Sequence, residues 1–177
     1  MSLIRFEAVL ARPLEGGDWL FLRLPQPASD QLPARSMCSV EGTLQGQPVA
    51  TTLLPDGEGG HWMKVEPDLI GSLGLAKGQT VSLEISPVKV EPEPKVPAEI
   101  AAALASASPL AQETWASITP MARRDWIFWI VSAKKAETRT KRLEVALSKL
   151  SAGNRRPCCF DRTGMYDKSL SCPVAEA

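Results

Sequence analysis

Basic side chains gather between residues 123 and 162, and their chemistry would be the binding of an anion. Eleven Lys and Arg side chains face only four acids there, a local excess of seven positive charges. On a continuous helix Lys135, Arg139 and Arg142 would fall at i, i+4 and i+7 and form one stripe. Such a stripe is either an ordinary solvated helix face or a surface for an anionic partner. The residues predicted to form the binding surface are Arg123, Arg124, Lys134, Lys135, Arg139, Lys141 and Arg142.

Catalytic chemistry has little support in the sequence. His61 is the only histidine, and no neighbour in the sequence completes a triad with it. The glycine-rich stretch Pro55–His61 contains two acids and leads into a segment with strand character, so it does not fit a phosphate-binding loop. It is typical of a flexible hairpin, with His61 as a partly exposed turn residue. We therefore expect a protein that is not an enzyme and has no cofactor.

The four cysteines suggest neither a disulfide framework nor a zinc site. Cys38 lies in the first half, whereas Cys158, Cys159 and Cys172 lie near the end of the chain. Their spacing lacks the paired Cys-x-x-Cys pattern of zinc ligands, so no metal is expected. Reduced thiols in a cytoplasmic protein are the better interpretation. Residues 155–177 are expected to be a loosely ordered tail, in which a redox-sensitive thiol stays an alternative.

The first half of the chain has the pattern of short strands separated by turns. Six such strands joined by Gly and Pro turns favour a small closed β-barrel, because closure removes exposed sheet edges. Two short stretches, 29–32 and 68–73, could form single helical turns. The predicted strands are 6–10, 19–24, 37–44, 49–54, 61–65 and 80–85.

The second half is predicted to be helical. Prolines at 87, 92, 94 and 97 make residues 89–97 an extended linker. Ser108-Pro109 and Thr119-Pro120 are typical helix starts, and Gly153-Asn154 a helix stop. Trp126 and Trp129 lie in a helix that is apolar on most of its circumference and should be central to the helical core.

These patterns together indicate an α+β fold with a closed six-stranded barrel followed by about four helices. The expected domains are the barrel at 1–88, the linker at 89–97, the helical domain at 98–154 and the tail at 155–177. Charge divides along the same line, with a net −4 over residues 1–96 and +4 over the remainder.

Several stretches also carry a family resemblance. Residues 97–115, 119–130 and 133–143, with Trp-Ile at 126–127 and Ala-Lys-Lys-Ala-Glu-Thr-Arg-Thr-Lys-Arg at 133–142, resemble the helical domain of the YdeI-like proteins. These are also called the OmpD-associated or bacteriocin-protection family. Residues 1–88, with Leu24-Pro25, Val40–Gly46 and Asp56–Gly60, resemble a small β-barrel domain of unknown function that often precedes it. The resemblance implies this two-domain architecture and, loosely, a role in stress tolerance, but no catalytic residues.

Two functional hypotheses follow from these observations. The first is a non-enzymatic interaction or stress-tolerance protein whose basic helical domain engages an acidic protein, a lipid headgroup or a nucleic acid. The alternative is a small-molecule binding protein, with the ligand at the barrel mouth or the domain junction near Trp19, Trp62 or Trp115. A cytoplasmic location is expected, because Arg5 and Glu7 interrupt any secretory signal and the longest apolar run, Trp126–Val131, is too short to span a bilayer.

Overall fold

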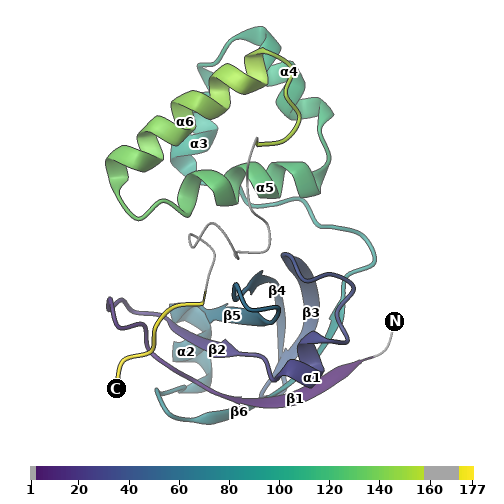
Figure 1. The fold of residues 1–177 in the computed structure, drawn as a ribbon, viewed down its shortest axis with the longest axis vertical. Helices are drawn as coiled ribbons and strands as arrows, with labels where there is room; N and C mark the ends of the chain where they lie inside the picture. Colours follow the sequence, from purple (N-terminus) through teal and green to yellow (C-terminus); the bar gives the residue numbers. More distant parts are fainter. Residues whose placement is uncertain (1–2, 158–171) are drawn as a thin grey trace. The chain divides into compact units, whose positions relative to one another are not determined.

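The chain divides into two compact units. In the computed structural model, which describes residues 3–157 and 172–177, one unit contains residues 3–89 together with 172–177, and the other contains residues 90–157 (Figure 1). The chain therefore begins and ends in the same unit, and the helical unit is inserted between two parts of the barrel unit.

The barrel unit is a nearly closed six-stranded antiparallel barrel. The strands pair in the order β1-β6-β3-β4-β5-β2. A bridge between Ala11 and Phe21, whose backbone N–H and C=O groups bond at 2.8 and 2.9 Å, brings the two edges together. The predicted barrel is thus confirmed. The strands are β1 (Ile4–Val9), β2 (Leu20–Arg23), β3 (Cys38–Leu44), β4 (Gln47–Pro55), β5 (His61–Val65) and β6 (Thr80–Pro87).

Alternation of side chains along the strands fills the barrel core. In β6, Val81, Leu83 and Ile85 are buried, while the residues between them are exposed. Gly42 in β3 has a separate role, because a Cβ atom there would lie 1.9 Å from the carbonyl oxygen of Glu84. Only glycine allows the β3 and β6 backbones to approach this closely. Two short helices, α1 (Gln26–Ser29) and α2 (Pro67–Leu73), lie in the connections.

The helical unit contains four helices: α3 (Ala98–Ala105), α4 (Pro109–Ser117), α5 (Pro120–Val131) and α6 (Ala136–Ser151). The predicted starts of α4 and α5 are confirmed, since Ser108 Oγ accepts from Ala111 N and Thr119 Oγ accepts from Ala122 N. Trp126 is completely buried in the core of the unit, packed with side chains from all four helices. No helix in the described ranges is long and apolar enough to cross a membrane.

The end of the chain differs from the expected loose tail. Residues 158–171, with Cys158 and Cys159, lie outside the described residues, but residues 172–177 run beside the segment that follows β1. Leu14 N donates to Val174 O and Glu176 N to Arg12 O, each at 2.8 Å. Lys77 Nζ also donates to Glu176 Oε1 at 3.0 Å. We call residues 172–177 the C-terminal strap. Its order comes from backbone pairing, which side-chain patterns do not reveal.

Candidate functional site

Two arginines of the predicted basic surface are used inside the helical unit. Arg123 Nη1 contacts both carboxylate oxygens of Glu93 at 2.6 and 2.7 Å, and Arg124 Nη1 donates to Glu91 Oε1 at 2.9 Å. Both acids come from the proline-rich segment 88–97, which forms neither helix nor strand. Arg124 is buried beside the fully buried Asp125. These two positive charges are therefore neutralised by acids of the same unit.

A second set of contacts places arginines at helix C-termini. Arg123 donates to the carbonyls of Trp115 and Ala116 in the last turn of α4, and Arg155 donates to Ser117 O at 3.0 Å. Arg142 Nη1 donates to Trp129 O of α5 at 2.6 Å, and its guanidinium lies 5.5 Å from the Trp129 ring centre. Positive charge is favourable at a helix C-terminus, where carbonyls lack partners.

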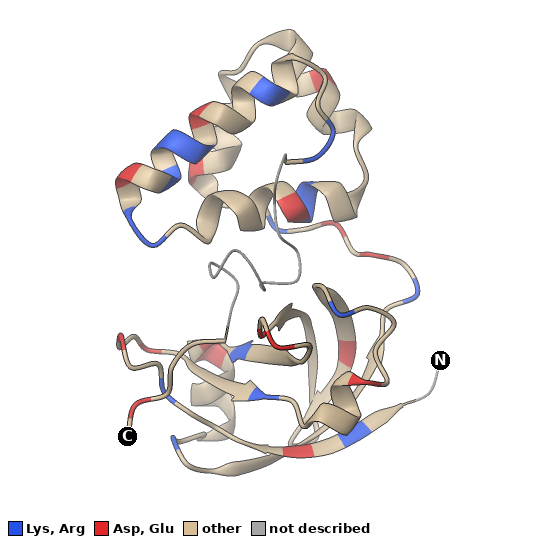
Figure 2. Cartoon of the chain, viewed as in Figure 1, with Lys and Arg blue, Asp and Glu red and all other residues tan. Residues whose placement is uncertain are grey.

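The stripe of Lys135, Arg139 and Arg142 required one continuous helix, and the helix is interrupted before Ala136. Helix α5 ends at Val131 and α6 begins at Ala136, so Lys135 is an extended capping residue between them. Four cations nevertheless lie within the range 134–141 at the start of α6, and Figure 2 shows basic positions on the α5–α6 turn and the adjoining helix. We call this group the basic end of α6; its members are Lys134, Lys135, Arg139 and Lys141.

The basic end of α6 has the electrostatics of an anion-binding surface. Lys134, Lys135 and Lys141 are exposed and Arg139 is half-buried. Helix α6 has no side-chain hydrogen bond at its N-cap, and the only acid in its first turn is Glu137. The N–H groups of the first turn add the positive end of the helix dipole to these side-chain charges.

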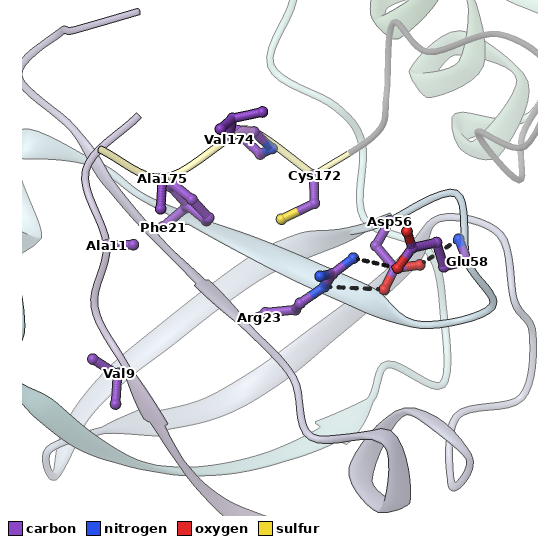
Figure 3. A pocket seen from close by; sticks show the side chains of 10 residues that line it. Val9, Ala11, Phe21, Arg23, Asp56, Glu58, Cys172, Val174 and Ala175 are labelled. Atoms are coloured by element: carbon purple, nitrogen blue, oxygen red, sulfur yellow. Dashed lines mark hydrogen bonds and ion pairs between the residues drawn. The ribbon is translucent and has the colours of Figure 1, made fainter. Parts of the chain in front are cut away.

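A second candidate site lies on the barrel unit. A pocket of about 570 Å³ opens on the outer wall of the barrel, where the C-terminal strap passes over β2 (Figure 3). We call it the strap pocket. Its lining residues are Val9, Ala11, Phe21, Arg23, Asp56, Glu58, Cys172, Pro173, Val174 and Ala175.

One end of the strap pocket is polar. Arg23 Nε donates to Asp56 Oδ2 at 3.3 Å, and Arg23 Nη2 donates to Glu58 Oε2 at 3.0 Å (Figure 3). The other oxygen of Asp56 accepts from the backbone N–H groups of Glu58 and Gly60. Burial acts to raise the pKa of Asp56, but these hydrogen bonds and Arg23 together lower it below 3.8. Asp56 is therefore ionised at neutral pH and fixes the guanidinium.

The other end of the strap pocket is apolar, and the thiol of Cys172 lies between it and Arg23 (Figure 3). Burial raises the pKa of Cys172 to about 11, so the thiol is protonated and uncharged at neutral pH. A protonated thiol is a poor nucleophile and metal ligand. Within the described ranges, no cluster of three His, Cys, Asp or Glu side chains could hold a metal ion.

His61 was expected to be a partly exposed turn residue, and this is wrong. It opens β5 and is buried, with Nε2 bonded to Ser36 O at 3.0 Å and its backbone N–H donated to Ser29 Oγ. Burial lowers its pKa, so the ring is neutral at pH 7. The loop before it does form the predicted β4–β5 hairpin, in which Gly57 and Gly59 adopt positive φ.

Sequence reasoning did not place the strap pocket. Of the tryptophans proposed to mark a ligand site, Trp19 and Trp62 stack at 6.4 Å in the barrel unit, and both rings contact Phe21 of the pocket wall. Trp115 belongs to the helical unit. The sequence did offer one indication of this pocket, because the charged Arg23 ends the otherwise apolar strand β2.

Each of the two units matches a protein-family model. Residues 93–153 match the family described as bacteriocin-protection, YdeI or OmpD-associated, and residues 6–85 match a domain of unknown function, DUF1905. No curated protein matches the chain. The suspected resemblance is confirmed for both halves.

Proposed function

Since the chain carries a domain of the bacteriocin-protection, YdeI or OmpD-associated family behind a DUF1905 domain, we propose that it acts by binding an anionic partner rather than by catalysis. In this proposal the helical unit contacts the partner through the basic end of α6. The family description supports a protective, stress-related role for that unit.

The observation that carries the proposal is the division of the basic residues into two groups. Arg123, Arg124 and Arg142 bond to acids and helix carbonyls of their own unit. Lys135 is the N-cap residue of α6, and Lys141 lies in its second turn; both are exposed. Lysine is suited to this role, because its long flexible side chain can reach phosphate or carboxylate groups without a fixed geometry.

The test is a charge reversal with a matched control. Lys135→Glu/Lys141→Glu changes the net charge by −4 at the basic end of α6. Lys89→Glu/Lys95→Glu makes the same change at exposed positions outside it. Binding to phosphatidylglycerol vesicles, duplex DNA and polyglutamate is measured at low and high salt, with circular dichroism to confirm that both variants are folded.

The wild type should bind at least one of these anions, with an affinity that falls as salt is added. The α6 variant should bind that anion about tenfold or more weakly, because each surface lysine contributes on the order of 1 kcal/mol near an anionic surface. The control variant should bind nearly as the wild type does. Equal weakening of both variants would mean that only net charge matters, and absence of binding to all three anions would contradict the proposal.

A further inference from the structure

The strap pocket has the size and construction of a small-molecule site, separate from the basic end of α6. Its volume of about 570 Å³ falls within the range of roughly 300–1,000 Å³ typical of ligand pockets. Its walls come from two segments remote in sequence, the outer face of the barrel and the C-terminal strap. Backbone hydrogen bonds from Leu14 and Glu176 hold the strap in place. The cavity is therefore formed before any ligand arrives.

The polar end of the strap pocket presents a preorganised cation. Asp56 cannot easily turn away, because it accepts two backbone hydrogen bonds and its side chain is only 7% exposed. Asp56 therefore holds Arg23, whose side chain is 50% exposed. Among the described residues, no acceptor is bonded to Arg23 Nη1. The guanidinium can therefore donate a hydrogen bond to a further oxygen atom, supplied by a ligand.

Glu58 is the replaceable member of this group. Its side chain is 74% exposed, and it lies in the loop between Gly57 and Gly59. An exposed carboxylate loses little when it leaves an ion pair for water. A ligand carboxylate could thus take the place of Glu58 on Arg23, while Asp56 keeps the guanidinium in position.

The rest of the strap pocket suits an apolar body. Phe21, Ala11, Val174 and Ala175 line this part of the pocket (Figure 3), and Phe21 is itself only 4% exposed. The thiol of Cys172 lies between this apolar end and Arg23.

We propose that the strap pocket binds a small carboxylic acid with an apolar body. Its carboxylate pairs with Arg23 in place of Glu58, and its body lies against Phe21 under the C-terminal strap. An amine of the same shape is disfavoured, because its positive charge would lie beside the guanidinium. The amine would also compete with Arg23 for Asp56 and Glu58.

The experiment uses three probes with the same ring system: 2-naphthoate, the neutral 2-naphthamide and the cationic 2-(aminomethyl)naphthalene. Calorimetry gives their affinities for the full chain, and amide and Arg side-chain NMR shifts report where they bind. We expect the carboxylate to bind best, with shifts at Phe21, Arg23 and Ala175. Preference for the amine, absence of binding by the acid, or shifts confined to other residues would overturn the proposal.

Four variants sharpen this result. Arg23→Gln should weaken naphthoate binding about tenfold or more, as expected for loss of a charge-assisted hydrogen bond. The difference in affinity between 2-naphthoate and 2-naphthamide should also become smaller. Glu58→Gln should tighten naphthoate binding, because the competing carboxylate is gone; a purely structural role for Glu58 predicts no such gain. Arg5→Gln removes an exposed arginine of β1 outside the pocket and should change nothing.

Ala175→Trp tests the apolar end at an exposed position that should not disturb the fold. It should fill the pocket and abolish naphthoate binding while the pair of Arg23 and Asp56 stays intact. Unchanged affinity in Ala175→Trp or in Arg23→Gln would overturn the proposal. Each variant tests the proposal by itself, so the proposal can still be overturned if only one of the two variants folds.

Discussion

The two units of the chain bury polar groups in opposite ways. In the barrel unit, the buried polar residues among those described are Ser29, Ser39 and His61, all uncharged at neutral pH. In the helical unit they are Arg124 and Asp125, both charged types. The difference follows from architecture, because the barrel joins its own edges through backbone pairing, whereas four short helices leave C-terminal carbonyls and an adjoining acidic segment to be satisfied.

This comparison shows that a basic sequence does not make a basic surface. Three of the twelve Lys and Arg residues after residue 96, namely Arg123, Arg124 and Arg142, bond to helix ends or to the segment 88–97. Arginine suits such contacts because its planar group can donate in several directions at once. In the proposed function, the lysines at the start of α6 instead contact the partner.

The largest effect should come from Arg124→Ala. Breaking a buried ion pair leaves the remaining charges uncompensated, which costs about 3–5 kcal/mol. Here Glu91 would lose the Arg124 donor, and Asp125 would lose one neighbouring cation and keep the more distant Arg156. The measurement is denaturant unfolding of the helical unit followed by circular dichroism at the helix band. A loss below about 1 kcal/mol would mean that the buried charges of this unit matter no more than exposed ones.

A smaller loss is expected for Arg142→Ala. The substitution removes the donors to Trp129 O and Ser132 Oγ at the end of α5. Leaving such groups unpaired costs about 1–3 kcal/mol. Arg142→Lys keeps the charge near the helix C-terminus and should recover part of the loss in thermal unfolding. If Arg142→Ala is as stable as the wild type, the helix end is satisfied by water instead.

The barrel unit should respond to pH through His61. Its folded-state pKa lies below the ordinary value of 6.5, so the unfolded chain binds more protons in this range. Stability is therefore complete above the unfolded pKa and falls as pH drops from about 6.5 toward the lower folded pKa. Unfolding of the barrel unit should show this slope in the wild type. His61→Gln should flatten it, and an unchanged slope would assign the effect to other groups.

The smallest effect is expected for Lys135→Gln/Lys141→Gln. Both side chains are exposed, so the free energy of unfolding should change by no more than about 0.5 kcal/mol. Thermal unfolding beside Arg124→Ala and Arg142→Ala gives the direct comparison between surface and internal cations. A loss of unfolding free energy comparable to that of Arg142→Ala would show that the basic end of α6 also stabilises the helical unit.

Much of the fold was predictable from local patterns. Alternation in β6 and the Ser-Pro and Thr-Pro starts of α4 and α5 are properties of neighbouring residues, and they identify these elements directly. Closure of the barrel followed from the number of short strands. The burial of His61 was not predictable, because its partners Ser29 and Ser36 come from a connection far away in the sequence.

The two candidate sites were harder to predict from the sequence, because they also depend on partners far away in the chain. The seven predicted basic residues include three whose partners are helix carbonyls or acids elsewhere in the unit, and a charge count cannot reveal such partners. The strap pocket depends on residues 172–177 pairing with the segment after β1 through backbone groups. Backbone pairing of so short a segment has no distinctive composition.

The barrel unit contains the chain segments on both sides of the helical unit, so it links the two ends of the helical unit as a covalent cross-link would. With residues 1–89 and the C-terminal strap held together, an unfolded helical unit would be a closed loop rather than a chain with a free end. Closing a loop of about 80 residues removes on the order of 4 kcal/mol of chain entropy from the unfolded state in the polymer description of cross-links. Weakening the strap by Lys77→Ala/Glu176→Ala should then lower the melting temperature of helices that neither residue belongs to, and an unchanged helical melting temperature would show that the strap does not act as a tether.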